Sequence, residues 1–210
     1  MGPAAFSRNW LSVLSQALGP VADRVLACFR VSTLIEISQD SNHWLGTYGP
    51  IQIVIWTTVE IPTAVCERML EVAEQMTRRN GGRRPAVLSI TCPTLQRPPS
   101  SGSRRALAAL VEAGSDRASR VAVVYEGHGF ILSSFLSVFL GIQMLVRPRH
   151  GYRFFTAIGD ALRWITEDID EFRSGAMRYE AARMAIERQS KRVRTQWLAN
   201  SAAAAGQPRL

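Results

Sequence analysis

Hydrophobic residues between Val31 and Phe172 follow two alternating patterns. Short runs rich in β-branched residues predict strands, and longer runs with apolar residues every three or four positions predict helices with one buried face. The run 62–79 is of the second kind, because Val65 and Met69 share one face. The predicted strands are 31–38, 43–48, 51–59, 85–92, 120–126 and 152–155. The predicted helices are 62–79, a helix introduced by the serines at 100–103, 130–146, and a last helix capped by Thr156 and running to Phe172.

The order of these strands and helices indicates the class of sheet. Gly49-Pro50 separates two strand-like runs, so 43–48 and 51–59 are expected to pair as a hairpin. The later strands are joined through helices, and such crossovers connect parallel strands. We therefore expect an α/β fold with a mixed, mostly parallel sheet of about five to six strands and helices packed on it.

Four segments are expected along the chain. Residues 1–30 carry a short apolar stripe at helical spacing and are predicted to be an N-terminal helical extension. Residues 31–172 form the α/β domain, and 173–199 form a basic C-terminal helix. Residues 200–210 are alanine-rich with Gly206 and Pro208, and we expect a disordered tail.

The run 130–146 is the longest apolar stretch and contains no charged residue. A helix of this length measures roughly 26 Å, short of the roughly 30 Å hydrocarbon core of a bilayer. The run also contains three serines, Gly141 and Gln143. We therefore expect a helix buried against the sheet and no transmembrane span.

The three cysteines, Cys28, Cys66 and Cys92, are widely spaced and form no Cys-x-x-Cys pair. An odd number at such spacing favours buried free thiols in a reducing compartment over a disulfide framework. We therefore expect a cytoplasmic protein.

The formal net charge of +8 is concentrated near the C-terminus. Residues 173–210 hold eight basic and two acidic residues, whereas the rest of the chain is nearly neutral. This charge could contact a nucleic-acid backbone or an anionic membrane, although a helix that docks on a protein or on a second copy fits equally well. The candidate anion contacts are Arg178, Arg183, Arg188, Lys191, Arg192 and Arg194.

The best-placed polar cluster is 126–129, between a predicted strand and the helix 130–146. Loops at the carboxyl ends of strands line clefts in α/β folds, so Glu126 and His128 are candidate cleft residues. The third glycine of a dinucleotide fingerprint is absent, and the three histidines lack metal-ligand spacing. We therefore expect no cofactor and no metal. A group of acidic residues, Glu167, Asp168, Asp170 and Glu171, is expected to form a solvated face or to pair with the basic tail.

A family resemblance is carried by three segments: a strand of type Arg-x-Ala-Val-Val, an aromatic segment of type Phe-x-Thr, and a segment of type Ala-Leu-x-Trp followed by a hydrophobic residue. These positions are Arg120, Ala122, Val123 and Val124, then Phe154, Phe155 and Thr156, then Ala161, Leu162, Trp164 and Ile165. With them, residues 31–172 resemble bacterial STAS-like domains, the class of the anti-sigma-factor antagonists. The resemblance implies a non-enzymatic module that binds other proteins and is often switched by phosphorylation of a serine at a helix N-terminus.

The matching place in this chain holds Ser100, Ser101 and Ser103. A phosphate there would meet unpaired N–H groups and change the binding of a partner. The alternative is that one of these serines only caps the helix.

The sequence thus predicts a regulatory or scaffolding module that binds a protein partner, with homo-oligomers as one form of that binding. Two alternatives stay open: a peripheral binder of an anionic surface through the basic helix, and a carrier of a small apolar ligand near Glu126 and His128.

Overall fold

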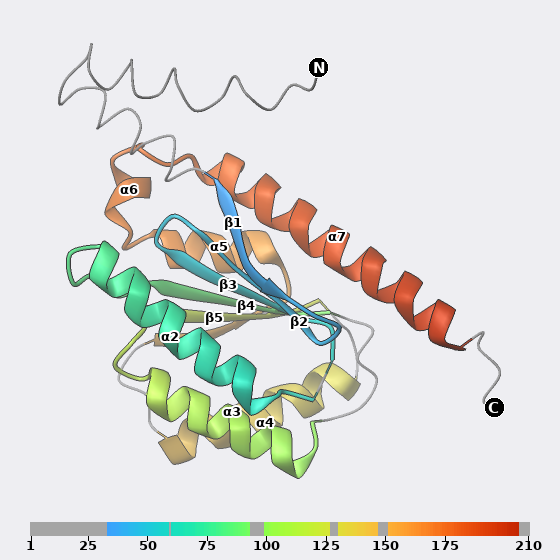
Figure 1. Cartoon of the computed structure of the whole chain (residues 1–210). Helices are drawn as coiled ribbons and strands as arrows, with labels where there is room; N and C mark the ends of the chain where they lie inside the picture. The colour runs from blue at the N-terminus through green and yellow to red at the C-terminus, as the bar shows by residue number, and fades with distance from the viewer. Residues whose placement is uncertain (1–32, 59, 93–98, 127–129, 147–150, 206–210) are drawn as a thin grey trace, which may run out of the picture.

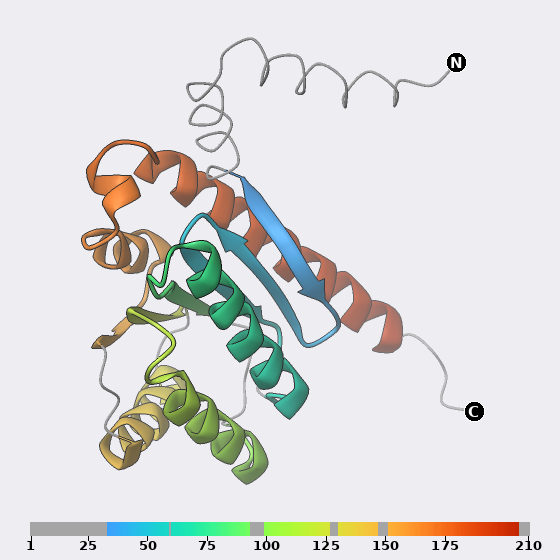
Figure 2. The ribbon, with the colours of Figure 1, turned by 60° about the vertical axis from the view of Figure 1, so that its left-hand side comes forward.

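The computed structural model describes residues 33–58, 60–92, 99–126, 130–146 and 151–205 (Figure 1). These residues form a six-stranded sheet with helices on both of its faces (Figure 2). The predicted α/β class, with a mixed and mostly parallel sheet, is confirmed. The predicted N-terminal extension, 1–30, lies outside the described residues.

The strands lie in the sheet in the same order as in the chain. Strands β1 to β3 form an antiparallel meander, and β3 to β6 pair in parallel. The predicted hairpin joins β2 to β3 through Gly49. Its φ of 54° lies in the left-handed region, which glycine adopts without steric cost. The strands are β1 Leu34–Gln39, β2 His43–Tyr48, β3 Ile51–Trp56, β4 Ala86–Thr91, β5 Arg120–Tyr125 and β6 Gly151–Phe155.

The three helices that connect the parallel strands all cover one face of the sheet, because successive crossovers of one hand return to the same side (Figure 1). They are α2 Thr63–Arg79, α3 Ser101–Gly114 and α4 Phe130–Val146. The opposite face is covered by α5 Ile158–Thr166 and α7 Tyr179–Ala205, with the short α6 Asp170–Arg173 between them. We call these the α2–α4 face and the α5/α7 face.

Each face has its own hydrophobic core. On the α2–α4 face, Leu45, Val54 and Trp56 of the sheet meet Val65, Met69, Val72 and Met76 of α2, together with Phe139 of α4. On the α5/α7 face, Trp44, Tyr48, Ile53 and Leu88 meet Leu162 and Ile165 of α5. Helix α7 adds Ala182, Ile186 and Val193 to the second core. It is therefore part of the folded body rather than an appendage to it.

The largest differences between the sequence-based boundaries and the structure lie after β6. The last core helix is broken, because α5 ends at Thr166 and α6 begins at Asp170. Its N-cap is Ala157 rather than the expected Thr156, and no side chain caps it. Helix α7 begins at Tyr179 and continues through Ala205, so residues 200–205, expected to be disordered, are helical. Alanine has the highest helix propensity, which explains why the alanine-rich run extends the helix.

Among the described residues, no helix is both long and apolar enough to cross a membrane. Helix α4 instead divides into two sides. Phe139 and Ile142 are buried, whereas Leu140 and Met144 are 50% and 77% exposed.

Candidate functional site

A polar groove of about 550 Å³ lies at the carboxyl ends of β5 and β6, between the start of α5 and the first half of α7. This is the edge of a parallel sheet at which α/β proteins bind their ligands. We call it the carboxyl-edge groove. Its lining residues include Glu126, Thr156, Asp160, Arg163, Tyr179, Arg183 and Glu187.

Two sets of predicted residues meet at this groove, although they were expected to act separately. Glu126, a predicted cleft residue, forms an ion pair with Arg194, a predicted anion contact. Arg183, another predicted anion contact, lines the groove. His128, the second predicted cleft residue, lies outside the described residues. The structure therefore joins the cleft to the basic helix at Glu126.

The ion pair of Glu126 and Arg194 reaches into the α5/α7 core. Cys92, at the end of β4, is completely buried there beside the Arg194 guanidinium. Burial raises the pKa of the Cys92 thiol, although the guanidinium opposes that rise. The Nε of Arg194 is buried and has no hydrogen-bond partner among the described residues. The sequence indicated that Cys92 would be a buried thiol, but it gave no sign of these neighbours.

The charges that line the groove largely neutralise one another. Arg183 lies between two carboxylates of its own helix, with Nη2 2.9 Å from Glu180 Oε2 and Nη1 3.5 Å from Glu187 Oε1. The hydroxyl of Tyr179 donates to the backbone oxygen of Gly159 at 2.8 Å, which ties α7 to the first turn of α5. The groove therefore presents both positively and negatively charged side chains, and the hydrogen bond between α7 and α5 holds its walls in place.

The six predicted anion contacts divide into two groups. Arg183 and Arg194 face carboxylates as described, and Arg192 lies 3.2 Å from Glu36 on β1. The remaining three, Arg178, Arg188 and Lys191, are exposed and form no ion pair with any residue that the structure describes. Half of the predicted set is thus used within the fold.

The three candidate serines at the start of α3 have different environments. Ser100 is the N-cap, and its Oγ accepts from the backbone N–H of Ser103 at 3.2 Å. The hydroxyls of Ser100 and Ser103 donate to Glu60 Oε2 at 2.7 and 2.6 Å. These two hydrogen bonds, led by that of Ser103, hold the pKa of Glu60 below its ordinary value. Ser103 is buried and Ser101 is exposed, so a carboxylate already occupies the place that a phosphate on Ser103 would take.

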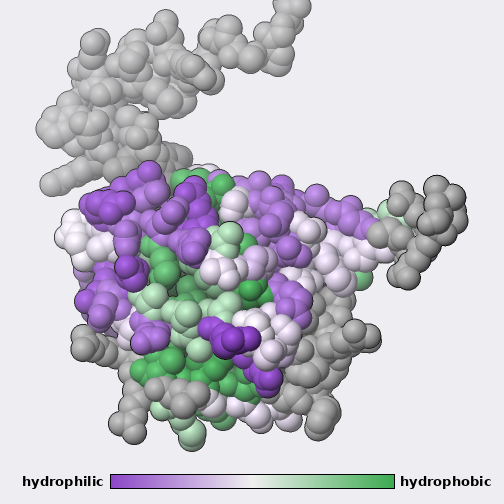
Figure 3. Space-filling view, turned by 60° about the horizontal axis from the view of Figure 1, so that its bottom comes forward, coloured by the Kyte–Doolittle hydropathy of each residue, from purple (hydrophilic) through white to green (hydrophobic). Residues whose placement is uncertain are grey.

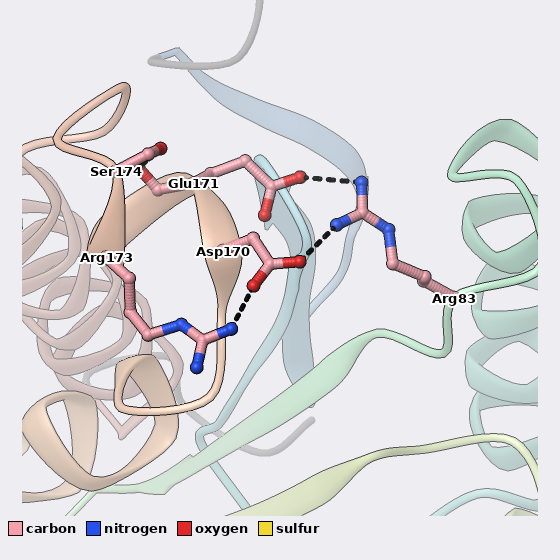
Figure 4. A network of polar contacts seen from close by, with 5 residues as sticks. All are labelled: Arg83, Asp170, Glu171, Arg173 and Ser174. Carbon is pink, nitrogen blue, oxygen red and sulfur yellow. Dashed lines mark hydrogen bonds and ion pairs between the residues drawn. The ribbon is translucent and has the colours of Figure 1, made fainter.

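The predicted acidic group pairs with arginines at the opposite edge of the sheet. Arg83 lies 3.1 Å from Asp170 and 3.2 Å from Glu171, and Asp170 also contacts Arg173 (Figure 4). Arg120 contacts Glu167 and Asp168. Of these partners, only Arg173 belongs to the predicted basic tail, and Arg83 and Arg120 belong to the α/β domain.

The described residues hold no group of three or more side chains suited to a metal ion. His43 is buried, with Nδ1 2.9 Å from Asp40 Oδ1 and Nε2 3.2 Å from Ser38 Oγ. Burial raises the pKa of Asp40, but hydrogen bonds from the backbone N–H groups of Asn42 and His43 outweigh it and leave the pKa below 3.8. This histidine therefore stabilises the turn between β1 and β2 through its contacts with Asp40 and Ser38.

Comparisons of the chain with protein-family models, with curated proteins and with solved structures find no match in any of the three sets. The STAS-like resemblance of residues 31–172 therefore depends on the residues of the sequence itself.

Proposed function

We propose that this chain is a non-enzymatic regulatory or scaffolding module that binds a protein partner. The observation that carries the proposal is the outer side of α4, where Leu140 and Met144 lie one turn apart and are 50% and 77% exposed. Figure 3 shows apolar side chains gathered over α3 and α4. Exposed apolar patches of this kind are typical of interaction sites.

The surroundings of this patch favour one kind of partner. Ser137 and Gly141 are exposed in a row beside the two apolar side chains, so a helix could approach the backbone of α4 closely. On the neighbouring helix α3, Arg104 and Arg105 are exposed and form no ion pair with the described residues. The partner that fits is an amphipathic helix with a narrow apolar stripe flanked by Asp or Glu.

The STAS-like resemblance supports the same class of function. In that resemblance a phosphoserine at the start of a helix controls partner binding, and Ser101 is the one of the three serines that is exposed without bonding Glu60. The informative variant is therefore Ser101→Ala. Replacing Ser103 would instead break the contact that holds Glu60 and would test stability.

The proposal is tested with the full chain immobilised and exposed to lysate of the native host. The double variant Leu140→Glu/Met144→Glu is compared with Met184→Glu, a control on an apolar side chain of α7 that is about as exposed as Leu140. We expect a protein that is captured by the wild type and the control and is lost with the double variant. That protein is then purified and its affinity for the three forms measured, with at least a tenfold loss expected for the double variant.

Two outcomes would contradict the proposal, and a third would identify the partner. The double variant could bind the purified partner as tightly as the wild type, or the control could lose the partner equally. The wild type could also self-associate through α4, which sedimentation velocity of the wild type and the double variant would reveal. In that case the partner would be a second copy of this chain.

A second candidate function is favoured by one observation: three exposed cations, one just before α7 and two on it, form no ion pair with the described residues. Arg178, Arg188 and Lys191 could contact an anionic surface. Truncation before α7 is not a clean test, because it removes Ile186 and Val193 from the core. The wild type should bind vesicles containing phosphatidylserine or duplex DNA, with an affinity that falls as the salt concentration rises. The charge-reversed variant Arg178→Glu/Arg188→Glu/Lys191→Glu should not bind either of them. Binding that is insensitive to salt, or unchanged in this variant, would rule the candidate out.

A further inference from the structure

The α2–α4 face encloses two neighbouring cavities. One, of about 70 Å³, lies between α2, α3 and the sheet. The other, of about 50 Å³, lies between α3, α4 and the carboxyl ends of the central strands. The residues that line both are Trp56, Ser89, Leu107, Val123 and Phe139.

The cavities exist because the helices on this face lie far from the strands. Helix α5 lies close against β4, β5 and β6, whereas α3 approaches α2 and α4 more closely than it approaches any strand. Among its residues, α3 buries only Ser103 and Val111 completely. Long side chains such as Met69 and Phe139 span the distance and leave space between them.

The lining of the cavities suits an apolar molecule of one ring, which needs the two spaces joined because each is smaller than a cavity that holds benzene. The walls are mostly aliphatic and aromatic side chains, and an engineered cavity of roughly 150 Å³ with such walls stays dry and binds benzene. Leu107 is half-buried and lies between the two cavities. A change of its rotamer would join the two spaces at little cost in packing.

One polar group at the junction indicates what the molecule carries. Trp56 Nε1 donates to Ser89 Oγ at 3.0 Å, so the hydroxyl hydrogen of Ser89 points away from the indole. None of the residues that the structure describes accepts that hydrogen. Ser89 lines both cavities, and it therefore presents a hydrogen-bond donor in apolar surroundings.

An ion pair marks one end of the larger cavity. Arg117 lines this cavity, and its Nε lies 2.9 Å from Glu74 Oε1 on α2. Both side chains are partly exposed, so the pair can open at little energetic cost. The larger cavity thus has an end at which a small molecule can enter between α2 and α3.

We propose that the two cavities form one binding site for a small neutral molecule with a single apolar ring and a carbonyl group, the carbonyl accepting from Ser89. This site lies across the sheet from the carboxyl-edge groove and does not depend on the protein-binding function. It also differs from the ligand site expected from the sequence near Glu126 and His128.

The proposal is tested by titrating the full-length protein with acetophenone and with benzene, using thermal unfolding and ligand-observed NMR. We expect acetophenone to raise the thermal midpoint in proportion to the logarithm of its concentration. In Ser89→Ala the affinity for acetophenone should fall about three- to tenfold, the value of one hydrogen bond. Benzene should bind Ser89→Ala as well as it binds the wild type.

Two filling variants and a matched control locate the site. Leu107→Trp places an indole in the shared wall, and Ala73→Leu fills the larger cavity from α2. Both should abolish acetophenone binding. Leu140→Trp, the same exchange on the exposed side of α4, should bind like the wild type. The absence of binding to the wild type would overturn the proposal, as would undiminished binding to whichever filling variants fold.

Discussion

On the α5/α7 face of the sheet, Ala161 and Leu162 are completely buried against strands that lie close to their helix. On the α2–α4 face, Leu107 is only half-buried and stands beside a cavity of about 70 Å³. The difference starts in the helices. The small side chain of Ala161 lets α5 approach the sheet, whereas α2 contacts it through long methionine side chains. One sheet thus carries a close-packed face that fixes the fold and a looser face with room for a ligand.

The largest expected effect comes from shortening one leucine to alanine on each face of the sheet, which compares the packing of the two faces directly. Leu162→Ala should cost about 3–5 kcal/mol of unfolding free energy, because a fully packed site cannot collapse around the lost atoms. Leu107→Ala should cost only about 1–2 kcal/mol, because the side chain is half-exposed and already borders empty space. Urea unfolding of both variants measures the difference. Equal losses would show that the two faces are packed alike.

The same glycine-to-alanine exchange should have opposite signs on the two faces. At Gly46 an added Cβ would overlap the Trp44 ring and lie 2.5 Å from the backbone oxygen of Ile35. Gly46→Ala should therefore cost about 2–3 kcal/mol. At Gly114, the last residue of α3, the nearest atom is Leu70 Cδ2 at 4.0 Å. Gly114→Ala should stabilise the protein by about 0.5–1 kcal/mol through helix propensity.

Thermal midpoints of these two variants provide the measurement. A stabilising Gly46→Ala would mean that the β1–β2 edge yields to the added methyl group. A destabilising Gly114→Ala would mean that α3 has no free space at its end.

The loss of stability at alkaline pH reports how well the α2 side of the sheet excludes water from Cys66. Burial raises the pKa of the Cys66 thiol from 9.0 to about 11. Because the unfolded thiol ionises first, the stability contributed by the neutral thiol is complete below pH 9 and is lost as the pH rises towards 11. The urea midpoint of the wild type should therefore fall more steeply across this range than that of Cys66→Ala.

Buried tyrosines titrate in the same direction. Burial raises the pKa values of Tyr48 and Tyr125, and both residues are present in the two proteins, so the difference between them isolates Cys66. Parallel curves would show that water reaches this thiol and that the α2 side is more open than the structure indicates.

The smallest effect on stability is expected at the end of the sheet opposite the carboxyl-edge groove, where α6 is held by polar contacts rather than by packing. Arg83, Asp170 and Glu171 form the network of Figure 4, and the side chains of Arg83 and Asp170 are 60% and 58% exposed. Arg83→Ala should therefore cost about 0.5 kcal/mol or less, and less still at high salt. A cost comparable to that of Leu162→Ala would show that the ion pairs, rather than the α5/α7 core, hold α6 in place.

The sheet could be predicted from the sequence because its signals are local. Apart from Gln52, the run Ile51 to Trp56 is apolar on both sides of the strand, and the structure buries all six of its residues between the two layers of helices. The role of α7 could not be predicted in the same way. Its buried positions include Gln189 and Ser190, which resemble surface residues in a hydrophobicity pattern. The sequence of α7 therefore shows only a thin apolar stripe.

The candidate site shows the same limit. Glu126 was predicted from its place after a strand, and Arg194 from the charge of the tail, but 68 residues separate them. A single sequence contains no information that pairs residues so far apart. Ser89 and Trp56 could not be identified as site residues for another reason. Their role depends on cavities that only the packing of three helices creates.

The neighbour-to-neighbour order of the strands has a consequence for synthesis on the ribosome. Each strand can pair with its predecessor as soon as it emerges, and the crossover helices can fold in turn. The contacts of β1 with α7 are different, since Glu36 meets Arg192 across 156 residues. The nascent chain must therefore expose the Trp44 side of the β1–β2 pair until α7 has been synthesised, which makes that pair the segment most in need of a chaperone.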